Sequence, residues 1–138
     1  MIITDTGFWL ALRNKKDKYH LHALECAEKY NTERFVTTWP VMVETFYLLM
    51  SRLSYEDALA FIHAYKICAF DVVNLHHSDA ARIEVLCRKY ADLPMDLADA
   101  SLVILAERLN HGRILSTDQR NFKTYRWKHR KPFNNLML

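Results

Sequence analysis

The sequence predicts a three-layer α/β/α fold with a central parallel sheet. Short apolar runs rich in β-branched residues alternate with longer segments of helical periodicity, which is the pattern of a parallel sheet covered on both faces. The chain has 138 residues but only two glycines and three prolines, which leaves little room for linkers. We therefore expect one domain over residues 1–138.

The predicted strands are short apolar runs bounded by polar or turn-forming residues. In the first of them, MIIT ends at Asp5, Thr6 and Gly7, which indicates a buried strand that leads into a turn. In chain order, the expected strands are residues 1–4, 35–38, 70–74 and 113–117, with 133–138 as a candidate edge strand.

Between these strands apolar residues recur at helical spacing, and capping residues mark several helix starts. Pro40 falls in the first turn of its helix, where proline is favoured, and Ser54 is an N-cap with Asp57 three residues further on. The most apolar helix follows Pro94 and contains ASLVILA. The expected helices are 8–13, 21–30, one that opens at Trp39, 55–65, 78–90 and 96–109.

Cysteine content and hydrophobic patterning restrict the compartment and exclude several classes of protein. Cys26, Cys68 and Cys87 are odd in number and form no C-x-x-C pair, so neither a disulfide framework nor a structural zinc site is expected. The start MIITDTGFWL lacks the pattern of a signal peptide, and no apolar run approaches the length of a membrane span. We expect a soluble, cytoplasmic protein without a membrane partner.

The net charge of +3 is unevenly distributed along the chain. Residues 113–131 carry seven Lys or Arg against one acid, whereas the remainder carries twelve basic and fifteen acidic residues. Tyr125 and Trp127 lie among these cations and are candidates for stacking on bases. The segment is therefore either a nucleic-acid contact or a solvated basic surface.

Four carboxylates stand beside apolar runs: Asp5, Glu44, Asp99 and Asp118. A carboxylate among apolar neighbours is costly unless it is protonated, paired or bound to a metal. Asp5 and Asp118 each follow a predicted strand, and ligands of parallel sheets bind beyond the carboxyl ends of the strands. A shared divalent cation would account for all four residues.

Each acid also has a purely structural interpretation. Asp5 and Asp118 are in positions where aspartate starts turns or caps helices, and Glu44 could occupy the polar face of its helix. Asp96, three residues before Asp99, is as good a cap as a ligand.

Oxygen ligands without Cys or His suit Mg²⁺ or Mn²⁺, and the matching chemistry is phosphodiester hydrolysis by a metal-activated water.

Four segments in this order and spacing resemble the PIN domain, and more narrowly the VapC-type ribonuclease toxins of bacterial and archaeal toxin–antitoxin pairs. They are IITDTG, VMVETFYLL, DLADASLVILAERL and ILSTDQRNF. The resemblance covers nearly the whole chain. It implies a Mg²⁺- or Mn²⁺-dependent endoribonuclease with a PIN-like fold, which forms homodimers and is neutralised by a small VapB-type antitoxin.

The resemblance also implies roles for individual residues. Asp5 and Asp99 would be the principal metal ligands, and Asp118 would complete the metal site directly or through water. Glu44 would position or deprotonate the attacking water. The supporting residues, whose roles are less defined, are Thr6, Asp96 and Thr117, of which Thr117 matches a hydroxyl position of the closing motif. The residues expected to contact RNA phosphate or the antitoxin are Arg120, Lys123 and Arg126.

Two other interpretations compete with a nuclease. A receiver-like signalling domain also binds Mg²⁺ in an acidic pocket, but Asp5 is followed by Thr6 rather than by a second acid, and RILSTD ends without the expected lysine. A catalytically silent PIN-like module would only bind RNA. Four clustered carboxylates kept without a metal would destabilise such a module.

Overall fold

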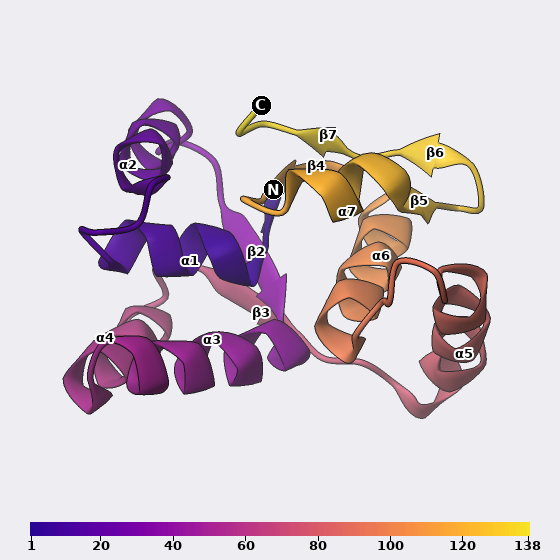
Figure 1. Ribbon diagram of the computed structural model, residues 1–138, viewed down its shortest axis with the longest axis horizontal. Coiled ribbons are helices and arrows are strands. Elements are labelled where there is room, and N and C mark those ends of the chain that lie inside the picture. Colours follow the sequence, from indigo (N-terminus) through magenta and orange to yellow (C-terminus); the bar gives the residue numbers. More distant parts are fainter.

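The computed structural model describes all residues from 1 to 138 and contains a five-stranded sheet in the order β3-β2-β1-β4-β7 (Figure 1). The strands are β1 (Ile2–Thr4), β2 (Phe35–Thr38), β3 (Asp71–Val73), β4 (Arg113–Leu115) and β7 (Asn134–Asn135). All four strand pairs are parallel. The predicted parallel sheet is thus confirmed, and the candidate edge strand exists as a two-residue strand beside β4.

Helices cover both faces of the sheet. They are α1 (Thr6–Arg13), α2 (His20–Lys29), α3 (Trp39–Arg52), α4 (Tyr55–Lys66), α5 (Ala80–Lys89) and α6 (Leu97–Leu109), with a short 3₁₀ helix η1 (His77–Asp79) before α5. Adjacent residues of β1 pack on opposite sides: Ile2 joins Phe8 of α1, whereas Ile3 joins Leu102 of α6. The expected three-layer arrangement is therefore confirmed, with α1 to α4 separated from α5 and α6 in Figure 1.

Helix α6 is the most buried element of the chain. Every residue from Ala98 to Ala106 is buried, which explains the long apolar run in the sequence. The hydroxyls of Thr38 and Ser101 form a buried hydrogen bond of 2.6 Å that ties the end of β2 to α6. The first turn of α6 is consequently held against the carboxyl edge of the sheet.

The chain after β4 differs from the prediction. The strand ends at Leu115 instead of residue 117, and helix α7 (Gln119–Thr124) and a hairpin of β5 (Arg126–Trp127) and β6 (Lys131–Pro132) follow. The six residues of α7 are too few to show a helical period in the sequence. The prediction that Tyr125 and Trp127 stack on bases is wrong, because both side chains are buried against the core around α6.

None of the helices combines the length and the apolarity needed to cross a bilayer. All three cysteines are free thiols: Cys26 is buried, Cys87 is partly buried and Cys68 is exposed. Cysteine pairing therefore contributes nothing to holding the layers together.

Gly112, at the start of β4, allows a close approach of the C-terminal hairpin. A Cβ atom at this position would lie 2.5 Å from Nε1 of Trp127 and 3.2 Å from Cα of Phe133. We expect Gly112→Ala to lower the free energy of unfolding by about 1–3 kcal/mol through overpacking, measured by urea unfolding. Asn110→Gly is the control, because φ of 58° at Asn110 favours glycine. An unchanged midpoint for Gly112→Ala would contradict this packing.

Candidate metal and active site

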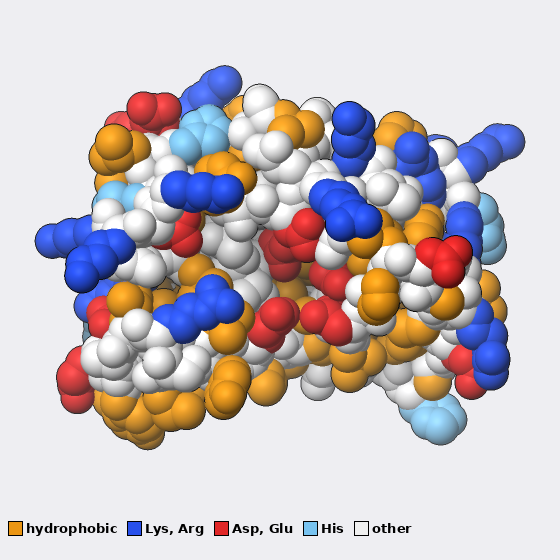
Figure 2. Space-filling view, viewed as in Figure 1, with side chains coloured by type: hydrophobic (Ala, Val, Ile, Leu, Met, Phe, Trp, Pro, Cys, Tyr) orange, Lys and Arg blue, Asp and Glu red, His pale blue; other side chains and the backbone are white.

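A pocket of about 300 Å³ opens at the carboxyl edge of the sheet, where β1 lies between β2 and β4. The strand order reverses direction at this point, which is where ligands bind in open α/β sheets. Five carboxylates and no Lys, Arg or His line the pocket: Asp5, Glu44, Asp96, Asp99 and Asp118. Figure 2 shows Asp and Glu side chains gathered around a hollow near the centre of this face. The structure thus brings together every acid singled out in the sequence.

Asp5 is the most enclosed of these acids, with 6% of its surface exposed. It caps α1: one oxygen accepts the Thr6 backbone N–H at 2.7 Å, and the other accepts the Ser116 hydroxyl at 2.9 Å. Burial raises the pKa of Asp5 to about 7, although both hydrogen bonds oppose the shift. Asp5 is therefore oriented firmly while its negative charge remains poorly compensated.

Ser116 joins the ends of β1 and β4. Besides donating to Asp5, its hydroxyl oxygen accepts the backbone N–H of Asp118 at 2.9 Å. One hydroxyl thereby sets the positions of two carboxylates. The sequence analysis did not single out Ser116, although a hydroxyl directly after a buried strand and two residues before Asp118 is a signal that could have found it.

Asn135 of β7 in turn holds Ser116. Its side-chain oxygen accepts the Ser116 backbone N–H at 3.3 Å, and its side-chain amide donates to the Ser116 carbonyl at 2.9 Å. The side chain is buried, so these bonds are shielded from water. The edge strand near the C-terminus thus supports the acidic pocket through Ser116. No local sequence signal marks Asn135, because the contact depends on the pairing of β7 with β4.

Asp96 and Asp99 form a reciprocal cap at the start of α6. The Asp99 backbone N–H donates to Asp96 at 2.8 Å, and the Asp96 backbone N–H donates to Asp99 at 3.2 Å. Burial, followed by the charges of Asp96 and Asp5, raises the pKa of Asp99 to about 8. Asp96 is exposed and caps the helix, while it also lines the pocket. Asp99 is the buried member that faces the other carboxylates.

Tyr125 contacts Asp99 from the buried core. Its hydroxyl lies 3.4 Å from an Asp99 oxygen and is buried. Burial and then the charge of Asp99 raise the pKa of this phenol, so it stays neutral and acts as a hydrogen-bond donor. Tyr125, which was expected to stack on nucleic-acid bases, therefore donates a hydrogen bond to Asp99 instead.

Glu44 faces the pocket from α3. One of its oxygens accepts the Thr6 hydroxyl at 3.0 Å, so the residue after Asp5 orients a second acid. Burial, followed by the charge of Asp96, raises the pKa of Glu44, and Arg52 on the same helix opposes the shift. Glu44 is half-buried, and its side chain lines the acidic pocket together with the four aspartates.

Asp118 caps α7 at the opposite wall. Its two oxygens accept the backbone N–H of Asn121 at 3.2 Å and the Asn121 side-chain amide at 2.7 Å. Thr117 also lines the pocket, and its hydroxyl lies against Gly7, where a Cβ atom would come within 1.9 Å of it. Gly7 thus permits the close approach of the segment after β4 to α1. The hydroxyl that contacts the aspartates belongs to Ser116 rather than to Thr117.

The predicted RNA- or antitoxin-binding residues lie outside the acidic pocket. Arg120, Lys123 and Arg126 line a separate cavity of about 750 Å³ beside α7. The Arg126 guanidinium donates to the backbone carbonyls of Lys123, Thr124 and Tyr125, so it caps the end of α7. The structure brings these three cations together but places them apart from the carboxylates.

The donor set fits a hard divalent cation. All charged side chains of the pocket are carboxylates. Burial, with a smaller contribution from the neighbouring acids, raises the pKa values of Asp5 and Asp99, and a bound cation would favour their ionised forms. No three acidic, His or Cys side chains converge tightly enough to hold an ion unaided. This suits Mg²⁺, which keeps several waters and takes one or two carboxylates. Asp5, Asp99 and Asp118 are among the carboxylates that line this pocket.

The raised pKa values predict that the metal-free protein loses stability as pH rises. Asp5 titrates at about 7 and Asp99 at about 8 when folded, against 3.8 when unfolded, so only the folded state retains these protons between pH 5 and 8. Melting temperatures in EDTA should therefore fall over this range, and Mg²⁺ should restore stability at pH 8.

Asp5→Asn isolates the contribution of one charge to this effect. The amide oxygen can still accept the Thr6 backbone N–H, and the amide N–H can donate to the Ser116 hydroxyl oxygen in place of the bond that this hydroxyl donates to Asp5. The variant should therefore be more stable than the parent by about 2–4 kcal/mol at pH 8 in EDTA, and no more stable at pH 4. A variant that is equally stable or less stable than the parent at pH 8 would show that the charge of Asp5 is compensated in the fold.

Comparisons with known proteins agree with this geometry. Residues 2–128 match the family model of the PIN domain. The chain is 27% identical over 125 residues to Ribonuclease VapC26 of Mycobacterium tuberculosis, which covers 91% of this chain and 92% of that protein. The crystal structure of VapC20 of the same organism, described as a Sarcin-Ricin loop cleaving toxin, superposes with a TM-score of 0.76 at 19% identity, covering 88% of this chain and 92% of that one. That likeness shows a shared fold, and the family match over most of the chain shows that this protein belongs to the PIN domain family.

Proposed function

We propose that this protein is a Mg²⁺- or Mn²⁺-dependent endoribonuclease and the toxin of a VapBC-type toxin–antitoxin system. The observation that carries the proposal is a pocket lined by five carboxylates and by no Lys, Arg or His side chain, at the point where the strand order of the sheet reverses. Membership of the PIN domain family and similarity to Ribonuclease VapC26 support ribonuclease activity. The same similarity supports the toxin role and an antitoxin of the VapB type as partner.

In the proposed mechanism Asp5, directly after β1, and Asp99, in the first turn of α6, would hold the metal, and Asp118 would complete the site directly or through water. The bound ion would supply an activated water and neutralise charge on the scissile phosphate. Glu44, which faces the same pocket, would accept a proton from the attacking water. Burial and then the charge of Asp96 raise its pKa, which favours proton uptake. Thr6 and Ser116 keep Glu44 and Asp5 in place.

Phosphates of the RNA must be bound by cations outside the pocket, because five carboxylates repel a polyanion. We propose Arg120 and Lys123, which are exposed on α7 directly after Asp118, as one set of such contacts. Arg126 would add its charge while capping the same helix. The same cations are available to acidic residues of the antitoxin.

We also propose that the protein acts in the cytoplasm as a homodimer. An apolar stripe on α3 supports an interface with a second copy of the chain. Trp39, Val43 and Tyr47 are four residues apart and exposed, and the exposed fraction is 67% for Val43 and 60% for Tyr47. Leu97 of α6 extends the stripe at the rim of the acidic pocket. Exposed apolar side chains that adjoin one another in this way are typical of protein interfaces.

Cleavage of RNA tests the proposal directly. The purified protein, free of antitoxin, is incubated with total cellular RNA in Mg²⁺, Mn²⁺ or EDTA, and new RNA ends are mapped. We expect discrete cuts that EDTA abolishes and that Asp5→Asn reduces by roughly a hundredfold or more. Asp92→Asn, which alters an exposed acid outside the pocket, should cut like the parent.

The same experiment separates the alternatives. A receiver-like domain is set aside because the chain belongs to the PIN domain family. A silent PIN-like module would bind RNA in every metal condition without cutting it, and that outcome would contradict the proposed nuclease. Folded Asp5→Asn protein that still cuts at the parental rate would show that the cleavage comes from a contaminant or from another site.

Asn135 provides a test of how the pocket is positioned. Asn135→Ala removes both hydrogen bonds to the backbone of Ser116, so Asp5 and Asp118 should lose their common support. Loss of such outer supports costs roughly 10- to 100-fold in metal affinity or activity. We expect weaker activation by Mg²⁺ and a lower kcat, with little change in the affinity for RNA.

Asn134→Ala is the matched control for Asn135→Ala, because Asn134 is the exposed neighbour on the same strand. Its activation by Mg²⁺ should equal that of the parent. If the activity of both alanine variants depends on Mg²⁺ concentration as that of the parent does, the hydrogen bonds from Asn135 stabilise the edge strand but do not position the pocket.

A further inference from the structure

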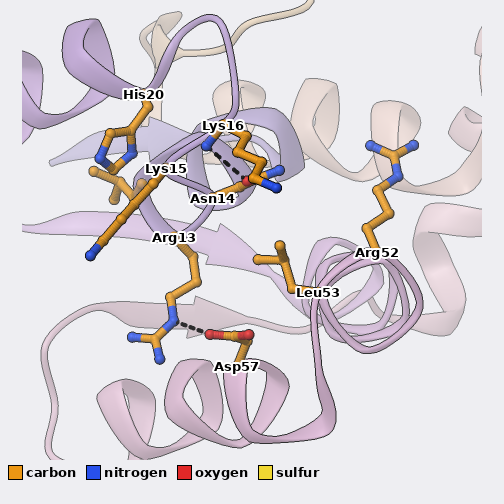
Figure 3. A pocket seen from close by; sticks show the side chains of 9 residues that line it. Arg13, Asn14, Lys15, Lys16, His20, Arg52, Leu53 and Asp57 are labelled. Carbon is orange, nitrogen blue, oxygen red and sulfur yellow. Dashed lines mark hydrogen bonds and ion pairs between the residues drawn. The ribbon is translucent and has the colours of Figure 1, made fainter.

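A second cavity, of about 690 Å³ and opposite charge, lies at the far ends of α1 and α3 (Figure 3). Four cationic side chains and a single carboxylate line it: Arg13, Lys15, Lys16, Arg52 and Asp57. Neither the motifs nor the comparisons assign a role to this cavity. We propose that it is a phosphate-binding subsite that holds the RNA strand a few nucleotides from the scissile bond, an inference that rests on the proposed nuclease function.

Most of the positive charge in this cavity is not neutralised by the protein. Lys15, Lys16 and Arg52 are exposed and form no ion pair in the structure. Within the Arg13 guanidinium only Nε donates to Asp57, at 2.5 Å, so the two outer nitrogens remain available. A cavity with several unpaired cations and one engaged acid favours an anionic ligand.

The cationic side chains are carried by ordered backbone. The Asn14 side chain accepts the backbone N–H of Lys16 at 3.0 Å, and the Asn14 carbonyl accepts the backbone N–H of Asp17 at 3.0 Å. These bonds shape the turn between α1 and α2 that presents Lys15 and Lys16. Asp57 is fixed by the Ser54 hydroxyl at 2.6 Å, and Asp57 in turn orients Arg13. The cavity is therefore formed before any ligand arrives.

The two pockets share the same pair of helices. Leu10 of α1 and Leu48 of α3 line the acidic pocket, whereas Arg13 and Arg52 line the basic cavity. Each cation lies three or four residues beyond its leucine, which is about one helical turn or 5 Å. A strand that leaves the acidic pocket along α1 and α3 therefore reaches these cations within a short distance.

The chemistry of the acidic pocket favours RNA as the ligand over an acidic protein segment. The carboxylates bind a scissile phosphate only through a cation, so affinity for the rest of the strand has to come from other positive groups. Arg126 beside α7 is already engaged by three backbone carbonyls. The basic cavity offers unpaired cations on the same two helices that line the acidic pocket.

A charge-removal series in the inactive Asp5→Asn background tests this subsite. The variant combines Lys15→Gln, Lys16→Gln and Arg52→Gln. The matched control combines Lys29→Gln, Lys66→Gln and Arg88→Gln, which remove three exposed charges that line neither pocket. Binding of a fluorescent single-stranded RNA is measured by anisotropy over a range of salt concentrations.

We expect the cavity variant to bind RNA roughly tenfold more weakly than the control, and the slope of log affinity against log salt to fall by about 2. With active protein, the cavity substitutions should lower kcat/KM for a long RNA but leave unchanged the cleavage of a dinucleotide that spans only the scissile bond. Equal RNA binding by the cavity and control variants would overturn the subsite.

Two further outcomes are distinguishable from these. If the cavity variant keeps its RNA affinity but loses binding to a polyglutamate peptide that the control retains, the cavity receives an acidic protein segment, and the RNA subsite is wrong. If the parent neither cuts nor binds RNA in any metal, the proposed nuclease function itself fails, and the subsite fails with it.

Discussion

Uncompensated negative charge at the carboxyl edge of the sheet is the constraint around which this structure is arranged. Asp5 and Asp99 are buried beside three other acids, and no cationic side chain lines their pocket. Burial raises the pKa values of both residues to the neutral range, so ionising them costs stability in the absence of a cation. Such a cost is typical of functional sites, where local stability is given up for chemistry.

The fold tolerates this charge because each carboxylate is held by a different element. Asp5 lies at the end of β1, Asp99 in the first turn of α6, and Glu44 on α3, while Asp118 starts α7. Their partners are hydroxyl and backbone N–H groups, which orient an anion without neutralising it. The carboxylates of the pocket are consequently held in fixed positions, while their negative charge remains available to a cation.

Support for the pocket extends to the last strand of the chain. The two residues of β7 add little area to the sheet, yet Asn135 binds both backbone groups of Ser116, and Ser116 binds Asp5 and Asp118. The C-terminal segment is thus more than a basic tail. Its aromatic residues pack beneath α6, and one of its arginines caps α7. Exposed cations line the basic cavity at the ends of α1 and α3 and the cavity beside α7. This arrangement suits a polyanionic substrate whose central phosphate lies at the acidic pocket.

Local pattern alone located most of the elements and the acids. The strands and long helices follow from their apolar periodicity, and Asp5, Glu44, Asp99 and Asp118 were recognisable because each stands beside an apolar run within a motif. Tyr125 was misjudged, since its neighbours in the chain are polar while its neighbours in space are the side chains around α6.

The contacts that make a site from these residues belong to the tertiary structure. The bonds from Asn135 to Ser116 depend on the parallel pairing of β7 with β4, and the basic cavity depends on α1 and α3 running side by side from one edge of the sheet. Neither arrangement leaves a local trace, because side-chain periodicity encodes burial within one element, whereas register and helix packing decide which distant residues meet.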